Sequence, residues 1–89
     1  MKHVSIYVKG KVQGVFFRAS TKEKADALGV KGTIQNNADG SVTIEAEGED
    51  QHLEQFVSWC RTGPRLARVD LCEVKEESLK DYINFSIVR

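Results

Sequence analysis

The sequence predicts an α+β fold of the ferredoxin-like (split βαβ) class, a sandwich in which two helices cover one face of an antiparallel sheet. Three observations predict it. Strand and helix patterns follow one another in the order βαββαβ, with a short strand at the end. Each helical segment carries a single apolar stripe, which it cannot bury alone. The 89 residues suffice for one modest core, so we expect residues 1–89 to form a single domain.

The first half of the chain supplies a strand, a helix and a hairpin. Apolar and polar residues alternate over residues 4–8, as in a half-buried strand. Good helix formers fill residues 17–28, and Gly29 ends that helix. Residues 30–35 and 41–47 read as strands joined by a short turn rich in Asn and Gly, and so close a connection predicts an antiparallel hairpin.

The second half supplies a helix and two strands. Residues 48–50 open a helix with acidic side chains, where the helix dipole favours them, and residues 63–64, Gly-Pro, end it. Residues 67–74 predict a fourth strand, with a bulge or twist where the apolar face changes, and residues 76–82 predict a polar loop. Residues 84–88 predict a last short strand, whose neighbour in the sheet the sequence does not identify.

Composition excludes several classes of function. The 13 basic residues balance the 13 acidic ones, so no positive field is available to attract nucleic acid. No apolar run approaches the roughly 20 residues that cross a membrane, and the amino terminus lacks the apolar stretch of a signal peptide. We therefore expect a cytoplasmic protein with neither a nucleic-acid partner nor a membrane partner.

The reactive side chains outside the predicted site are expected to be structural. Cys60 and Cys72 are too few for a disulfide framework and are interpreted as reduced thiols, with Cys60 on the apolar stripe of its helix. His3 and His52 lack partner ligands at metal spacing and are predicted to lie on the surface. Glu47 falls on the polar face of its strand and is predicted to be solvated.

The most informative stretch is residues 10–18, GKVQGVFFR, which connects the first strand to the first helix. A glycine-bearing turn at a helix start leaves several backbone N–H groups free, and the helix dipole adds partial positive charge there. Arg18 places a permanent, forked cation beside those groups. Such a site suits an anion, phosphate above all.

Two motifs resemble the signatures of the acylphosphatase family. The stretch from Val8 to Arg18 resembles the first, G-x-V-Q-G-V-x-F-R, and the segment from Gly32 to Gly48 resembles the second in both spacing and glycines. The second motif departs from the family pattern at Thr33, where an aromatic residue is usual, and at Gln35, where Lys or Arg is common. The resemblance extends over nearly the whole chain.

The resemblance implies hydrolysis of acyl phosphates to a carboxylate and inorganic phosphate, without a metal or any other cofactor. It implies that Arg18 binds the phosphate and that Asn36 holds the attacking water. The backbone amides of the loop are implied to complete the phosphate site, which inorganic phosphate or sulfate would also occupy; this set is Gln13, Gly14, Val15, Phe16, Phe17 and Arg18.

Two classes of function remain open on the sequence. The first is a monomeric, cofactor-free acylphosphatase acting on a small acyl phosphate. The alternative is a non-catalytic module that binds phosphate or acyl phosphate, because related domains occur inside larger proteins that handle carbamoyl phosphate. The sequence does not identify the physiological acyl group.

Overall fold

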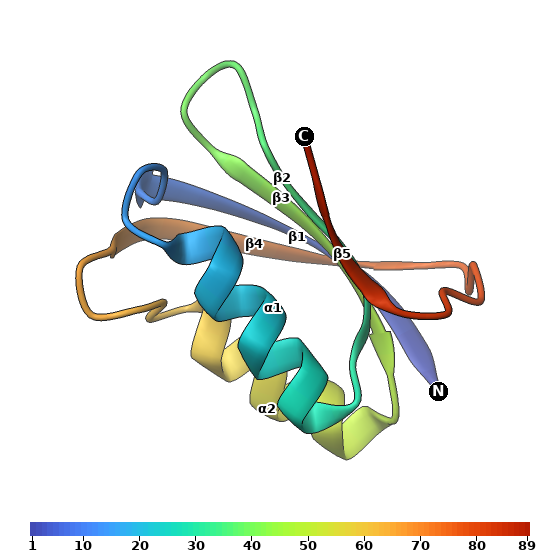
Figure 1. Cartoon of the computed structure of the whole chain (residues 1–89). Coiled ribbons are helices and arrows are strands. Elements are labelled where there is room, and N and C mark those ends of the chain that lie inside the picture. Colours follow the sequence, from blue (N-terminus) through green and yellow to red (C-terminus); the bar gives the residue numbers. More distant parts are fainter.

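The computed structural model describes residues Met1–Arg89 and contains a five-stranded sheet with two helices on one side (Figure 1). The elements in chain order are β1 (Lys2–Lys11), α1 (Phe17–Leu28), β2 (Lys31–Asn36), β3 (Val42–Gly48), α2 (Asp50–Cys60), β4 (Arg68–Glu77) and β5 (Phe85–Val88). The predicted ferredoxin-like order is confirmed. The fourth strand runs on to Glu77, three residues beyond its predicted end, into the segment predicted to be a loop.

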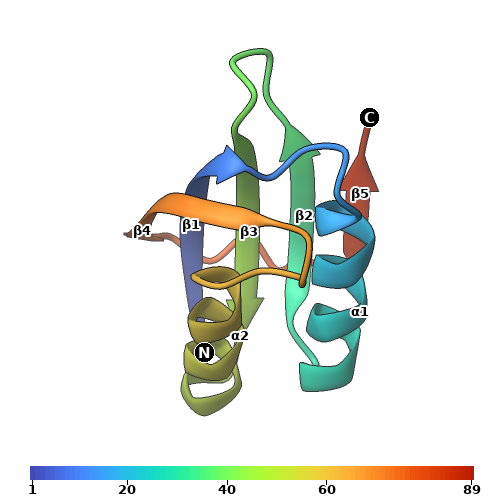
Figure 2. The ribbon, with the colours of Figure 1, turned by 90° about the vertical axis from the view of Figure 1, so that its left-hand side faces the viewer.

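The strand order in the sheet is β4-β1-β3-β2-β5. The four strands of the βαββαβ core are antiparallel to their neighbours, as predicted. The last strand, which the sequence left unplaced, pairs with β2 in parallel, so the complete sheet is mixed. It forms the edge of the sheet on the side of α1 (Figure 2). Neither helix is long and apolar enough to cross a membrane.

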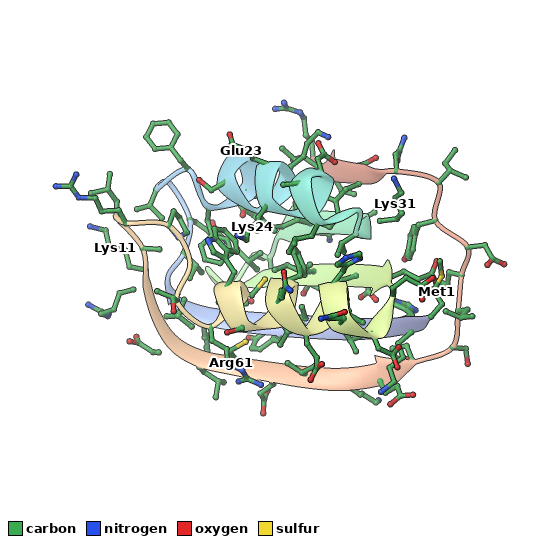
Figure 3. The ribbon with its side chains drawn as sticks, turned by 90° about the horizontal axis from the view of Figure 1, so that it is seen from below. Met1, Lys11, Glu23, Lys24, Lys31 and Arg61 are labelled. Carbon is green, nitrogen blue, oxygen red and sulfur yellow. The ribbon has the colours of Figure 1, made fainter.

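The core lies between the sheet and the two helices, and charged side chains such as Glu23 and Lys31 point outward from it (Figure 3). The central strands contribute Ile6, Ile34 and Ile44, all fully buried. The helices contribute the apolar stripes that their spacing predicted; their buried residues are Phe17, Thr21, Ala25, Leu53, Phe56 and Cys60. Helix α1 ends before Gly29, as predicted, and Gly29 adopts a left-handed conformation.

The irregularity predicted in the fourth strand is a β-bulge. The register between β1 and β4 shifts at Lys9 and Gly10, so that Asp70 has no partner on β1. Gly10 has a φ of 134°, and a Cβ at this position would lie 2.1 Å from the carbonyl oxygen of Arg68. Only glycine allows this close backbone approach, one residue before β1 ends at Lys11.

The prediction that His3 lies on the surface is wrong. The imidazole is only 1% exposed, because the segment between β4 and β5 folds over this end of the polar sheet face. Its Nδ1 lies 2.6 Å from the carbonyl oxygen of Ser78, and its Nε2 lies 2.7 Å from Oε1 of Glu45. The ring of Tyr82 meets it edge-on at 5.7 Å. Both ring nitrogens therefore have oxygen partners within the chain.

The prediction that Glu47 is solvated is also wrong, for the same reason. Its side chain accepts hydrogen bonds from the backbone N–H groups of Lys80, Asp81 and Tyr82, at 2.7, 3.2 and 3.0 Å. Strand alternation places Glu47 on the polar face correctly but does not reveal that a distant segment covers that face. Glu47 therefore holds in place the segment that leads into β5.

We expect Glu47→Gln to lower the free energy of unfolding by about 2–3 kcal/mol at neutral pH, since three N–H groups lose a charged acceptor. Burial by itself raises the pKa of Glu47. The hydrogen bonds from Lys80, Tyr82 and Asp81, with the charge of His3, outweigh burial and hold that pKa below its ordinary value of 4.5. The carboxylate is thus more stable in the folded chain than in the unfolded chain.

The lowered pKa of Glu47 determines how its contribution to the free energy of unfolding depends on pH. The contribution of Glu47 is complete above pH 4.5, the value in the unfolded chain, and is lost as the pH falls through the lower folded value. Urea unfolding of wild type and Glu47→Gln at pH 7, 5 and 3 measures this, with the exposed Glu23→Gln as the matched control. The difference between wild type and Glu47→Gln must narrow on acidification; a constant difference would contradict the assignment.

Candidate active site

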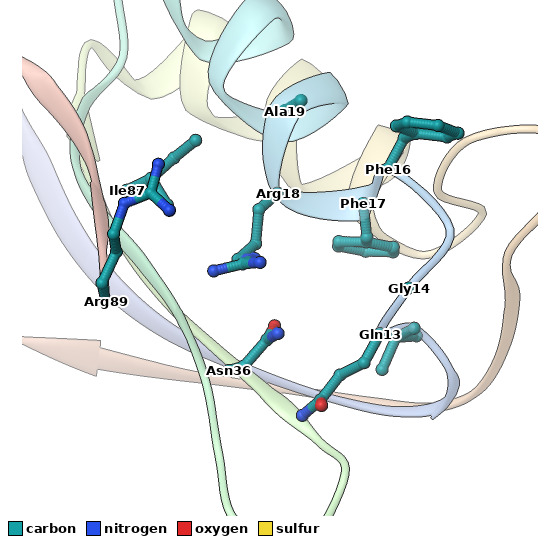
Figure 4. Close-up of a pocket in the computed structure, with 10 residues that line it drawn as sticks. Gln13, Gly14, Phe16, Phe17, Arg18, Ala19, Asn36, Ile87 and Arg89 are labelled. Carbon is teal, nitrogen blue, oxygen red and sulfur yellow. The ribbon is translucent and has the colours of Figure 1, made fainter.

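A pocket of about 350 Å³ opens at one end of the sheet, where β1 leads into α1 and β2 leads into the hairpin (Figure 4). The sequence-predicted site residues meet there, although Asn36 is 18 positions beyond Arg18. The residues that line the pocket are Val12, Gln13, Gly14, Phe16, Phe17, Arg18, Ala19, Asn36, Ile87 and Arg89. None of them is acidic. Val15, the remaining predicted residue, is buried and does not line the pocket.

The loop between β1 and α1 has an unusual backbone. Gly14 and Phe16 are both left-handed, with φ of 72° and 62°. No backbone carbonyl or side chain accepts a hydrogen bond from the N–H groups of Gly14, Val15 or Phe16. Left-handed residues that alternate with ordinary ones turn successive N–H groups toward one point, which forms a concave anion site. The loop therefore has the backbone of an anion site and N–H groups without internal partners.

The left-handed Phe16 is a strained position, because a residue with a Cβ costs about 1–3 kcal/mol in such a conformation. The surroundings hold it there. Val12, Val15 and Phe17 are buried in the core on either side, while the ring of Phe16 itself is 74% exposed. Strain that the fold maintains at an exposed loop is typical of a ligand-binding backbone.

Gln13 has a role that the sequence did not reveal. Its side-chain Nε2 donates to the backbone carbonyls of Asn37 and Ser41, at 2.9 Å each. The loop is thereby tied to the β2–β3 hairpin, which carries Asn36. The motif identified Gln13 only as a source of a backbone amide, because its side-chain partners are 24 and 28 positions away.

Arg18 lies in the first turn of α1, and its side chain points into the pocket toward Asn36 (Figure 4). Its side chain forms no ion pair and no hydrogen bond within the chain. A cation at a helix amino terminus is unfavourable by itself. The unpaired guanidinium and the free N–H groups together make this end of the pocket strongly attractive to an anion.

Asn36 is the last residue of β2, and its side chain projects into the pocket. Its Oδ1 is buried and has no hydrogen-bond partner in the chain. Buried polar atoms are nearly always paired, so an unpaired carbonyl oxygen at a pocket is available to a ligand or a water molecule. The neighbouring Asn37 forms the turn, as predicted: its Nδ2 donates to the hydroxyls of Ser41 and Thr43, at 2.8 Å each.

Two lining residues, Ile87 and Arg89, come from the carboxyl end of the chain and were not predicted. Parallel pairing of β5 with β2 brings them to the same sheet end as Asn36. No signal in the sequence marks them, because the position of the last strand was not identified.

The two cysteines, Cys60 and Cys72, lie outside the pocket as free thiols, and burial raises the pKa of both above the ordinary value.

Comparison with known proteins adds independent information. A family model described as Acylphosphatase matches residues 4–87. A protein from Rubrobacter xylanophilus named acylphosphatase is 51% identical over 76 residues, which cover 85% of this chain and 69% of that protein. One of the same name from Methylococcus capsulatus is 41% identical over 90 residues, which cover 100% of this chain and 98% of that protein.

The fold is also similar to solved structures. The crystal structure of acylphosphatase from Bacillus subtilis superposes with a TM-score of 0.96 at 38% identity, and the match covers 100% of both chains. Full-length HypF, solved in a phosphate- and nucleotide-bound form, contains a similar region with a TM-score of 0.92 at 34% identity. That match covers 99% of this chain but 12% of HypF.

Proposed function

The chain belongs to the acylphosphatase family of enzymes, and we propose that its activity depends on Arg18, Asn36 and the backbone amides of residues 13–18. The substrate class is acyl phosphates, whose carboxyl–phosphate bond is hydrolysed to a carboxylate and inorganic phosphate. One observation carries the proposal: a single pocket contains free N–H groups, an unpaired guanidinium and a buried amide oxygen without a partner.

The phosphoryl group is proposed to bind between the loop and Arg18. The N–H groups of Gly14, Val15 and Phe16 have no acceptor within the chain and are available to donate to phosphoryl oxygens. The guanidinium of Arg18 donates through two parallel N–H groups to a further pair of oxygens. The loop backbone is already ordered by its buried valines and by Gln13, so binding requires little reorganisation.

Hydrolysis then needs positioning more than a strong base. A water molecule attacks phosphorus, the bond from phosphorus to the carboxyl oxygen breaks, and the carboxylate leaves with the electron pair. The transition state is loose and carries its charge on the equatorial oxygens, which the N–H groups and Arg18 stabilise. Oδ1 of Asn36 accepts one hydrogen of the water and orients its lone pair. The proton that water loses ends on the inorganic phosphate product.

Steady-state hydrolysis of benzoyl phosphate, followed by loss of its ultraviolet absorbance, tests the proposal. We expect turnover that a metal chelator does not change, and competitive inhibition by inorganic phosphate, which occupies the same donors. The same assay tests the alternative of a non-catalytic module, which is considered because a similar region occurs within the longer protein HypF. Calorimetric binding of phosphate without any turnover of benzoyl phosphate would identify the chain as a binding module and contradict the proposed mechanism.

A further inference from the structure

The pocket contains a second arginine that the proposed mechanism does not use. Arg89 directly follows β5 and lines the pocket with Arg18. Its guanidinium forms neither an ion pair nor a hydrogen bond with another residue. Two arginines thus share a pocket that no Asp or Glu lines, in a chain with 13 basic and 13 acidic side chains in all. Like charges repel, so this arrangement favours a ligand with more than one anionic group.

The two arginines do not serve the same part of the pocket. In Figure 4, Gln13, Gly14 and the two phenylalanines lie on one side of Arg18, while Ile87 and Arg89 lie on the other side. The phosphoryl group is proposed to lie on the side of the loop, where the free N–H groups are. The part bounded by Ile87 and Arg89 is then left for the acyl group.

The size of the pocket allows this division. A cavity of about 150 Å³ accepts benzene, and this pocket encloses about 350 Å³. A phosphoryl group and a small acyl group therefore fit together. Ile87 offers the acyl group an apolar contact, and Arg89 offers a cation on the same side of Arg18 (Figure 4).

We propose that Arg89 is a specificity-determining residue, which favours acyl phosphates whose acyl group carries an anionic group of its own. This inference rests on the proposed function, since it assumes that the phosphoryl group occupies the side of the loop. Arg89 acts on the acyl portion and not on the reacting phosphorus. Its guanidinium attracts a carboxylate or a second phosphate in the acyl group by charge and by paired hydrogen bonds.

The test compares benzoyl phosphate with its 3-carboxy and 4-carboxy derivatives, which have the same ring and reacting bond but place a carboxylate at two distances. The measured quantity is the ratio of kcat/KM for each carboxylated substrate to kcat/KM for benzoyl phosphate. In Arg89→Gln we expect this ratio to fall about threefold to fivefold for the better isomer, as for a partly exposed ion pair. Arg89→Lys is expected to retain part of the preference, and high salt is expected to reduce it in wild type.

Lys31→Gln is the matched control, because it also removes one positive charge but lies at the other end of β2, away from the pocket. It must leave the ratio unchanged. Thermal unfolding of each variant establishes that the rates are compared between folded proteins. An unchanged ratio in Arg89→Gln, or an equal fall in Lys31→Gln, would overturn the inference. In either case turnover of benzoyl phosphate by wild type would still support the proposed function, so the two failures are distinguishable.

Discussion

Replacing Arg18 by alanine is expected to lower kcat/KM for benzoyl phosphate by about 10³-fold or more, because one charge and two charge-assisted donors leave the site at once. Arg18 has no internal partner, so its removal breaks no ion pair of the fold. The substitution also removes a cation from the amino terminus of α1, where the helix dipole makes a positive charge unfavourable. The variant is therefore expected to be as stable as wild type, or slightly more stable.

Arg18→Lys separates charge from geometry. Lysine keeps the positive charge but cannot form two parallel hydrogen bonds, so we expect it to recover only part of the lost rate. Inhibition by inorganic phosphate is the second measurement, since it reports binding without chemistry. Full activity in Arg18→Ala, with unchanged inhibition by phosphate, would show that the guanidinium does not contact the phosphoryl group.

Asn36→Ala has the second largest expected effect, a loss of about 10²–10³ in kcat with little change in KM. The reason is that Oδ1 is proposed to orient the attacking water and not to hold the phosphate. Its buried oxygen lacks a partner in the chain, so the substitution removes no internal hydrogen bond of that atom. Stopped-flow or steady-state hydrolysis of benzoyl phosphate over a range of concentrations gives both constants.

Asn36→Asp and Gln35→Ala complete the comparison. Aspartate keeps an acceptor at the position but adds a negative charge beside the bound dianion, so KM is expected to rise. Gln35 precedes Asn36 on the same strand, is exposed and lies outside the pocket, and its replacement must leave both constants near wild type. A rise in KM without a fall in kcat for Asn36→Ala would mean that this side chain binds substrate instead of water.

The sequence predicts most of the fold because the chain is regular over short distances. Alternation and helical spacing identify the core faces of β1, α1, β3 and α2, and residues such as Ile6 and Phe56 lie where their spacing places them. The position of β5 is not predictable in this way. It is four residues long and pairs with a strand more than 50 positions earlier, so no local pattern records its neighbour.

The same distinction applies to the site. Residues 13–18 and Asn36 were predicted from motifs, and the fold brings all of them except the buried Val15 to the lining of one pocket. The link from Gln13 to the hairpin, the burial of His3 and Glu47, and the presence of Arg89 were all missed. Each of these features depends on contacts between segments that are far apart in the chain. The alternation of apolar and polar residues predicts which face of the sheet a side chain lies on, but not which segment covers that face.

The central claim is that the backbone of the loop binds the phosphoryl group, and the most direct measurement is a titration of the ¹⁵N-labelled chain with inorganic phosphate, followed by amide chemical shifts. The account predicts saturable shifts concentrated at Gly14, Val15, Phe16 and Arg18, which are abolished or greatly weakened in Arg18→Ala. Shifts spread evenly over the surface lysines, or a saturable site elsewhere with these loop amides unmoved, would contradict it.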